Sequence, residues 1–272
     1  MSSRLTSLLL SSLLMLPLSF SAHAGEPSQD LITLHHLRLA AQKTLSDFFM
    51  FNGMEGDQRY AKQIKASEEQ VSVALQQLQD LSGEGSKALH NQLQQQWQAY
   101  QEELKALITA LETEGFTDLQ PIADLAKRNQ QLLVLSGELY GKIQQESSTS
   151  VPPLTERSRE LGLLMQSISV NYASRNASVG GTFIGGSGGE DEKPIDELAN
   201  DFQKRLSELK ASPRNTAEIK ASLQSVQTKW NYIEKSLKNY NENSVPFLIS
   251  KYSEQIISGL EKTSELYAAG KL

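Results

Sequence analysis

The 272-residue sequence contains no cysteine. This absence excludes disulfide bonds, thiolate metal sites, covalent haem attachment, a cysteine nucleophile and an N-terminal lipid anchor. The sequence also has no run of Lys or Arg, and its formal net charge is −6 at pH 7. Nucleic acids and anionic membrane surfaces both require concentrated positive charge on their partners. Neither is therefore expected to be the partner of this chain.

Apolar runs long enough to cross a bilayer, about 20 residues, are absent as well. The apolar stretch at residues 8–20 is too short and contains a proline. Arg4 precedes this stretch, and Ala22-His23-Ala24 follows it with small residues at the positions of a cleavage site before Gly25. This order is typical of a secretory signal peptide. We interpret residues 1–24 as such a signal, which predicts a soluble, periplasmic mature protein with no membrane span.

Strand-like alternation is missing from the remaining sequence, which shows helical periodicity almost to its end. Three segments of the first half match segments of the second half in the same order. The matched residues are Leu37, Ala41, Thr44 and Phe48 with Leu161, Met165, Ile168 and Tyr172; Leu93, Trp97, Tyr100 and Leu104 with Val226, Trp230, Ile233 and Leu237; and Glu138-Leu139-Tyr140 with Glu265-Leu266-Tyr267. Three ordered matches, each phased as a helix face, predict a tandem duplication.

Each repeat is expected to contain four helices. The first repeat covers residues 25–146, a linker covers 147–153, and the second repeat covers 154–272. The predicted helices are 28–52, 57–82, 84–113 and 119–146, then 154–177, 194–211, 214–241 and 246–269. Short connections favour antiparallel neighbours, and one apolar stripe per helix closes a bundle. The predicted fold is all-α, a tandem duplication of an antiparallel up-down four-helix bundle. Stacking of the bundles end to end and packing side by side both remain open.

Candidate chemical groups are few. His35 and His36 are adjacent, so on a helix they point about 100° apart and do not share one metal ion. We expect both at the surface or at a helix end. The glycine-rich residues 180–189 lack the Gly-Lys-Ser/Thr ending of a phosphate-binding loop and are expected to form an exposed loop. Charged residues are scattered along helix faces, where solvated surface is expected. No catalytic arrangement is identifiable, so we expect a non-enzyme without cofactor or metal.

Two glutamines and the two tryptophans occupy matched positions in the repeats. Trp97 and Trp230 lie within apolar stripes and are predicted to be core residues. Gln42 and Gln166 lie one residue past a core position, at the edge of the buried face. A side-chain amide there needs a hydrogen-bonding partner. That partner is either a neighbouring helix or a ligand.

The segment Leu163–Tyr172 resembles the first helix of the PilJ/NarX-like sensor family. These are the N-terminal domains of type IV pilus chemotaxis transducers and nitrate-sensing kinases. Gln166 and Tyr172 match the glutamine and the aromatic residue of the family, and Gln42, Lys43 and Phe48 match in the segment Leu39–Phe48. The resemblance implies an extracytoplasmic four-helix bundle in each repeat. The arginine that precedes the family's glutamine is absent, because Ala40 and Leu164 occupy its positions.

The first repeat is the better candidate for a family-type pocket. Arg38 and Gln42 are four residues apart and share a helix face, so they can converge on a small anion or metabolite while Lys43 flanks it. Gln166 is the corresponding candidate in the second repeat. The sequence thus predicts a sensory or ligand-binding protein that acts through a separate membrane receptor or kinase. The alternative is a scaffold or assembly protein of the envelope without a small ligand.

Overall fold

The structure is a computed structural model that describes residues 29–177, 193–242 and 244–270. The predicted signal segment and the glycine-rich residues 180–189 lie outside the described residues. The described residues form eight α-helices and no strand. The helices are α1 (Gln29–Gly53), α2 (Gln58–Gln77), α3 (Glu84–Glu114), α4 (Leu119–Ser147), α5 (Pro153–Ala177), α6 (Ile195–Lys210), α7 (Ala217–Lys238) and α8 (Pro246–Ala269). The prediction of an all-α helical bundle is confirmed.

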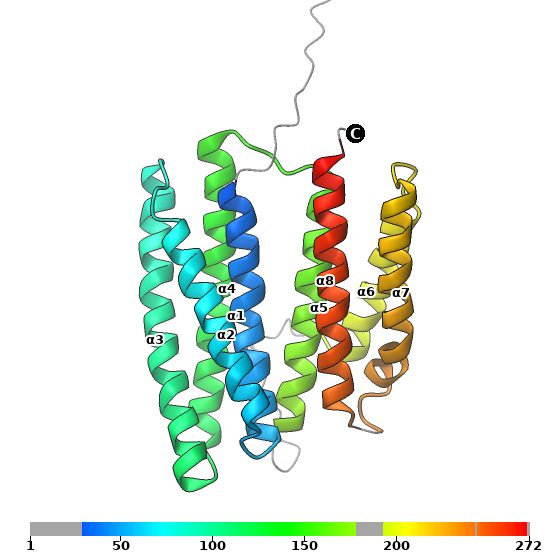
Figure 1. The fold of residues 1–272 in the computed structure, drawn as a ribbon. Helices are drawn as coiled ribbons and strands as arrows, with labels where there is room; N and C mark the ends of the chain where they lie inside the picture. The colour runs from blue at the N-terminus through cyan, green and yellow to red at the C-terminus, as the bar shows by residue number, and fades with distance from the viewer. Residues whose placement is uncertain (1–28, 178–192, 243, 271–272) are drawn as a thin grey trace, which may run out of the picture.

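The eight helices run up and down in two groups of four that lie side by side (Figure 1). Helices α1–α4 form the first bundle and α5–α8 form the second. Helices α1 and α5 contact each other at the centre, while α3 and α7 lie at the outer flanks. The structure thus decides for side-by-side packing. The origin of the two bundles by duplication remains a prediction.

Local sequence signals place several helix ends. The Asp57 side chain accepts a hydrogen bond from the backbone N–H of Arg59 and caps α2, and Thr216 caps α7 in the same way. Helix α3 ends at Gly115, whose φ of 78° is left-handed and therefore favours glycine. Pro246 begins α8, where its missing N–H costs no helical hydrogen bond.

Each bundle has its own apolar core. Trp97 is buried in the first core and stacks on Tyr100, with ring centroids 5.2 Å apart. Trp230 is buried in the second core beside Phe202, at 4.4 Å between centroids. The prediction that both tryptophans are core residues is confirmed. Ala173 of α5 packs into the first core, and the partly buried Val170 packs against it.

Helix α1 departs from the expected pattern of one apolar stripe per helix. Sixteen of its 25 residues are buried, because it packs against α2, α4 and α5 at once. The buried set includes polar side chains such as His35 and Asp47, each 2% exposed. The expectation that His35 lies at the surface or a helix end is therefore wrong, as is the expectation of solvated charges for Asp47. Because three helices pack against α1, little of its surface remains exposed, and these two side chains lie in the covered part.

Candidate functional site

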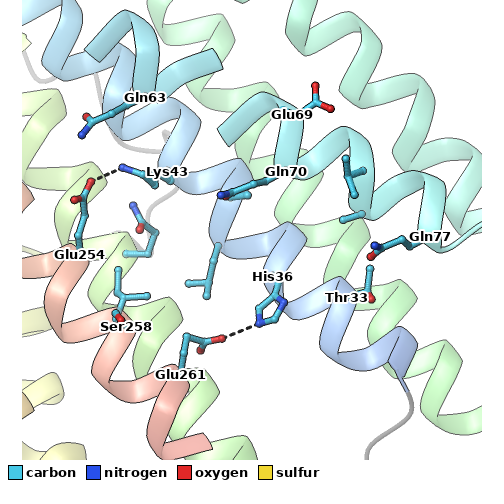
Figure 2. Close-up of a pocket in the computed structure, with 16 residues that line it drawn as sticks. Thr33, His36, Lys43, Gln63, Glu69, Gln70, Gln77, Glu254, Ser258 and Glu261 are labelled. Atoms are coloured by element: carbon cyan, nitrogen blue, oxygen red, sulfur yellow. Dashed lines mark hydrogen bonds and ion pairs between the residues drawn. The ribbon is translucent and has the colours of Figure 1, made fainter. Parts of the chain in front are cut away.

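A groove of about 820 Å³ runs along the junction of the two bundles (Figure 2). Its floor is formed by α1 with one residue of α5, and its walls are α2 of the first bundle and α8 of the second. The lining residues are Thr33, His36, Leu39, Ala40, Lys43, Gln63, Glu69, Gln70, Val73, Ala74, Gln77, Gln166, Glu254, Ile257, Ser258 and Glu261. These residues define the groove.

Helical spacing explains why these side chains share one groove. Gln63, Gln70 and Gln77 of α2 are seven residues apart, and seven residues make nearly two full helical turns. This glutamine row therefore follows one side of α2 for about 21 Å. On α8, Glu254 and Glu261 are also seven residues apart, which corresponds to about 10 Å along the axis.

The middle of the groove is apolar. Leu39 and Ala40 of α1, Val73 and Ala74 of α2, and Ile257 of α8 contribute hydrocarbon surface to it. The groove is therefore an apolar trough with polar groups along its rims and at its two ends. This combination is typical of small-molecule sites, where apolar contact supplies area and a few polar groups fix orientation.

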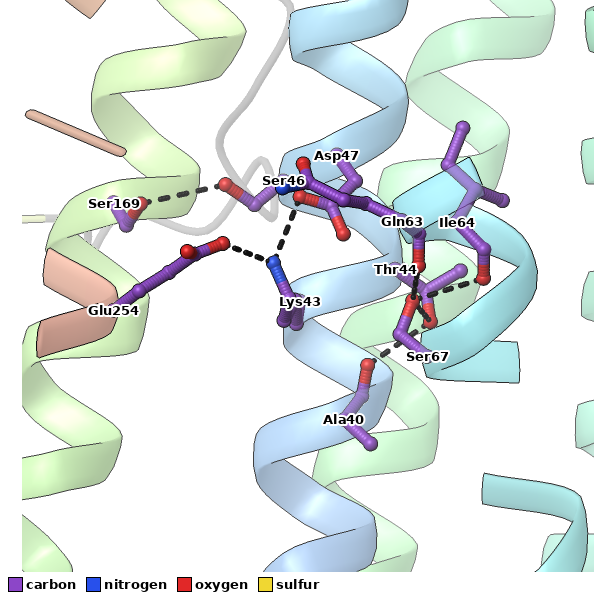
Figure 3. Close-up of polar contacts among 10 residues, drawn as sticks. All are labelled: Ala40, Lys43, Thr44, Ser46, Asp47, Gln63, Ile64, Ser67, Ser169 and Glu254. Carbon is purple, nitrogen blue, oxygen red and sulfur yellow. Dashed lines mark hydrogen bonds and ion pairs between the residues drawn. The ribbon is translucent and has the colours of Figure 1, made fainter. Parts of the chain in front are cut away.

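At one end of the groove, Lys43 links the two bundles (Figure 3). Its Nζ donates a hydrogen bond to Asp47 Oδ1 at 3.1 Å and also forms an ion pair with Glu254 of α8. Burial raises the pKa of Asp47 to about 7, although Lys43 acts in the opposite direction. Burial alone would lower the pKa of Lys43, but Asp47 and Glu254 outweigh it and raise that pKa.

Two hydroxyl groups of α1 next to Lys43 add polar contacts with α5 and with α2. Ser46 Oγ lies 3.4 Å from Ser169 Oγ of α5, between the two bundles. Thr44 Oγ1 donates to Ser67 Oγ of α2 at 2.9 Å and lies 2.9 Å from the carbonyl oxygen of Ala40. Hydroxyls and charges therefore join α1 to its neighbours at this level, beside the apolar contacts of the first core (Figure 3).

At the other end of the groove, two histidines of α1 hold one carboxylate of α8. Nε2 of His35 donates to Glu261 Oε1 at 2.8 Å, and Nε2 of His36 donates to Glu261 Oε2 at 3.0 Å. Burial would raise the pKa of Glu261, but these two hydrogen bonds outweigh it and lower the pKa to about 2. Burial lowers the pKa of His35 despite Glu261. The adjacent histidines thus converge on a carboxylate of the second bundle.

Gln166 is the most deeply buried of the glutamines that line the groove. It is 5% exposed, lines the groove from α5, and its side chain forms no hydrogen bond with any described residue. On the α2 wall of the same groove, the Oε1 atom of Gln63 is buried and without a hydrogen-bonding partner. Buried polar atoms are normally paired, so the Gln63 oxygen, together with the Gln166 amide that lines the same groove, indicates a place for a bound molecule or water.

The four residues predicted as a site separate into two pairs. Lys43 and Gln166, from different bundles, line the same groove. Arg38 and Gln42 do not line it. Burial lowers the pKa of Arg38, while Glu156 of α5 and Tyr140 of α4 act in the opposite direction, which places its guanidinium within electrostatic reach of both helices. Gln42 is 9% exposed, and its Oε1 atom is buried without a hydrogen-bonding partner. The structure therefore does not bring Arg38 to Lys43.

Sequence reasoning missed the groove residues of α2 and α8. The seven-residue spacing of Gln63, Gln70 and Gln77 is readable in the sequence, but nothing there indicates that α8 lies opposite. Glu261 lies 226 residues from His35 along the chain. Only the side-by-side packing of the bundles brings these groups together.

Among the described residues, no cluster of three or more His, Asp or Glu side chains is placed to hold a metal ion. Within the same residues, none of the helices is long and apolar enough to cross a membrane. No family model, curated protein or solved structure matches the chain. The resemblance to the PilJ/NarX-like family therefore rests on the two sequence segments alone.

Proposed function

We propose that this chain is an extracytoplasmic binding protein whose ligand occupies the groove between the bundles. The observation that carries the proposal is the unpaired, 5% exposed side chain of Gln166 facing a groove shared by both bundles. A bound molecule would supply the hydrogen bonds that the Gln166 and Gln63 amides lack within the protein.

The architecture also supports a sensory role. The two walls of the groove belong to different bundles with separate apolar cores. Apolar contacts, such as that of Ala173 with the first core, and polar contacts, such as that of Lys43 with Glu254, both join the bundles. A ligand that contacts both walls would favour one packing of the bundles over another. A membrane receptor or kinase that recognises one packing would then respond to the ligand.

The competing function, an envelope scaffold or assembly protein without a small ligand, is favoured by a different observation. Both bundle cores are filled with apolar side chains, so the hollow lies outside the cores rather than within either bundle.

Variants that block the groove distinguish a binding protein from a scaffold. Gln70→Trp places a large ring in the groove from an exposed position, and Gln95→Trp, exposed on α3 and outside the groove, is the matched control.

The experiment is a thermal-shift screen of anions, amines and neutral metabolites against the mature protein and both variants. A ligand present at about 100 times its Kd stabilises the native state by about 2.7 kcal/mol. At about 2–4 °C per kcal/mol for a protein of this size, we expect a rise in Tm of about 5–10 °C. The rise should occur in wild type and Gln95→Trp and be lost in Gln70→Trp. A screen without any stabilising compound, or with equal shifts in all three proteins, would contradict the binding function and favour the scaffold.

A further inference from the structure

The charge balance of the groove points to a cationic ligand. Three carboxylates, Glu69, Glu254 and Glu261, line it against one ammonium group, that of Lys43. Lys43 is already paired with Glu254 and with Asp47 behind it. Glu261 is bonded to His35 and His36, so of the three carboxylates Glu69 alone has no ion pair with a described residue. The lining carboxylates nevertheless outnumber the lysine, and an anion entering the groove would be repelled. This differs from the anion that the sequence led us to expect.

Among the residues that line the groove, the buried polar atom without a partner is an acceptor. The buried Oε1 atom of Gln63 has no hydrogen-bonding partner, and the Gln166 side chain offers an amide oxygen as well. Each carboxylate has about four acceptor positions, and Glu261 uses two of them for His35 and His36. A ligand rich in N–H donors can bond these acceptor positions. The ammonium group of a protonated primary amine is such a ligand group, because it has three N–H donors.

Lys43 shows how the groove holds such a group. Its ammonium, carried on a flexible hydrocarbon stem, is shared by carboxylates of both bundles at one end of the groove. The apolar middle, formed by residues such as Leu39 and Ile257, accommodates methylene groups. The two carboxylates of α8 lie about 10 Å apart along the helix.

We infer that the groove binds a linear aliphatic polyamine, with ammonium groups at Glu254 and Glu261, methylenes over the apolar floor, and an N–H donated to Gln166. An extended chain advances about 1.2 Å per bond. A triamine with nine bonds between its terminal nitrogens, such as spermidine, therefore reaches about 11 Å and matches the spacing of the two carboxylates. The inference rests on the proposed function, since it specifies the ligand class of the same groove.

The test is calorimetric titration of the mature protein with spermidine at physiological salt, together with hexylamine, succinate and nitrate as comparison probes. Gln166→Leu and Glu261→Gln remove one acceptor and one charge from the groove. Glu265→Gln, exposed on the same helix and outside the groove, is the matched control for charge. Circular dichroism and Tm establish that each variant is folded.

We expect spermidine to bind at least tenfold more tightly than hexylamine. Its affinity should fall at least tenfold in Gln166→Leu and in Glu261→Gln and stay unchanged in Glu265→Gln. Equal affinity in all four proteins would indicate non-specific attraction to acidic surface and overturn the inference. Binding of succinate or nitrate that is lost in Lys43→Gln would overturn the polyamine while leaving the proposed function intact. Absence of binding by every probe, together with no effect of Gln70→Trp in the screen, would overturn both.

Discussion

The burial of the Asp47 carboxyl predicts how the free energy of unfolding changes with pH. Burial raises the pKa of Asp47 from 3.8 to about 7 in the folded protein, and the side chain is 3% exposed. The folded state therefore holds a proton on this group that the unfolded state has released over the intervening pH range. The stabilisation linked to that proton is complete below the unfolded pKa of 3.8 and is lost as the pH rises through about 7.

The magnitude follows from the two pKa values. Between about pH 5 and pH 8, ionisation of Asp47 should reduce the free energy of unfolding by about 2–3 kcal/mol. The variant Asp47→Asn has no ionisable group at this position, so it escapes this loss. Lys43 keeps Glu254 as its partner in the variant, which limits the effect of losing the Asp47 charge.

The assay is urea denaturation of the mature wild type and Asp47→Asn at several values across that pH range. The difference in unfolding free energy between variant and wild type should shift by about 2–3 kcal/mol in favour of the variant as the pH rises. Asp80→Asn, at an exposed position between α2 and α3, is the control for removing a carboxylate elsewhere in the same bundle. A difference between wild type and Asp47→Asn that stays constant within about 0.5 kcal/mol would refute the assignment of a raised pKa to Asp47.

Three further predictions concern packing and processing. In Gly259→Ala, the new Cβ would lie 2.6 Å from Cγ2 of the buried Val226, so overpacking between α7 and α8 should destabilise the protein by about 1–3 kcal/mol in urea denaturation. In Gly137→Ala no atom lies within 4 Å of the new Cβ, so this variant should be more stable than wild type by about 0.5–1 kcal/mol. Equal effects of the two substitutions would contradict the close contact between α7 and α8. Trp230→Ala should cost about 3–5 kcal/mol by the same assay, and a change below about 0.5 kcal/mol would place the ring at the surface. Mass spectrometry of a periplasmic extract should find a mature protein beginning at Gly25, whereas an intact precursor held in the membrane would contradict the signal assignment.

Much of the helical architecture could be predicted from the sequence because local patterns carry it. The eight predicted helices agree with those observed to within a few residues at most ends. The predicted 57–82 is longer than α2, which ends at Gln77, and the predicted 214–241 extends beyond α7 at both ends. Helix ends are set by capping and by contacts with other helices, which periodicity alone does not encode.

The candidate site was less accessible to prediction, because it depends on how the bundles pack together. Lys43 and Gln166 were identified as candidates, yet their common groove requires α1 and α5 to lie side by side. Arg38 was expected beside them because it shares a face with Gln42, but Arg38 does not line the groove and is influenced instead by Tyr140 of α4 and Glu156 of α5. The sequence of α1 did indicate its central position, because many polar residues interrupt its apolar pattern. A helix without a single apolar stripe is one that packs on several sides.

The most direct test of the central claim, a ligand site in the groove, uses the side-chain amide of Gln166 as a reporter. Its resonance is assigned in a ¹⁵N spectrum of the mature protein by its disappearance in Gln166→Leu. Titration with spermidine should shift this resonance together with those of the amides of Gln63 and Gln70, with one common dissociation constant. Shifts confined to exposed acidic residues of α3 and α7, with the Gln166 resonance unmoved at saturation, would contradict the account.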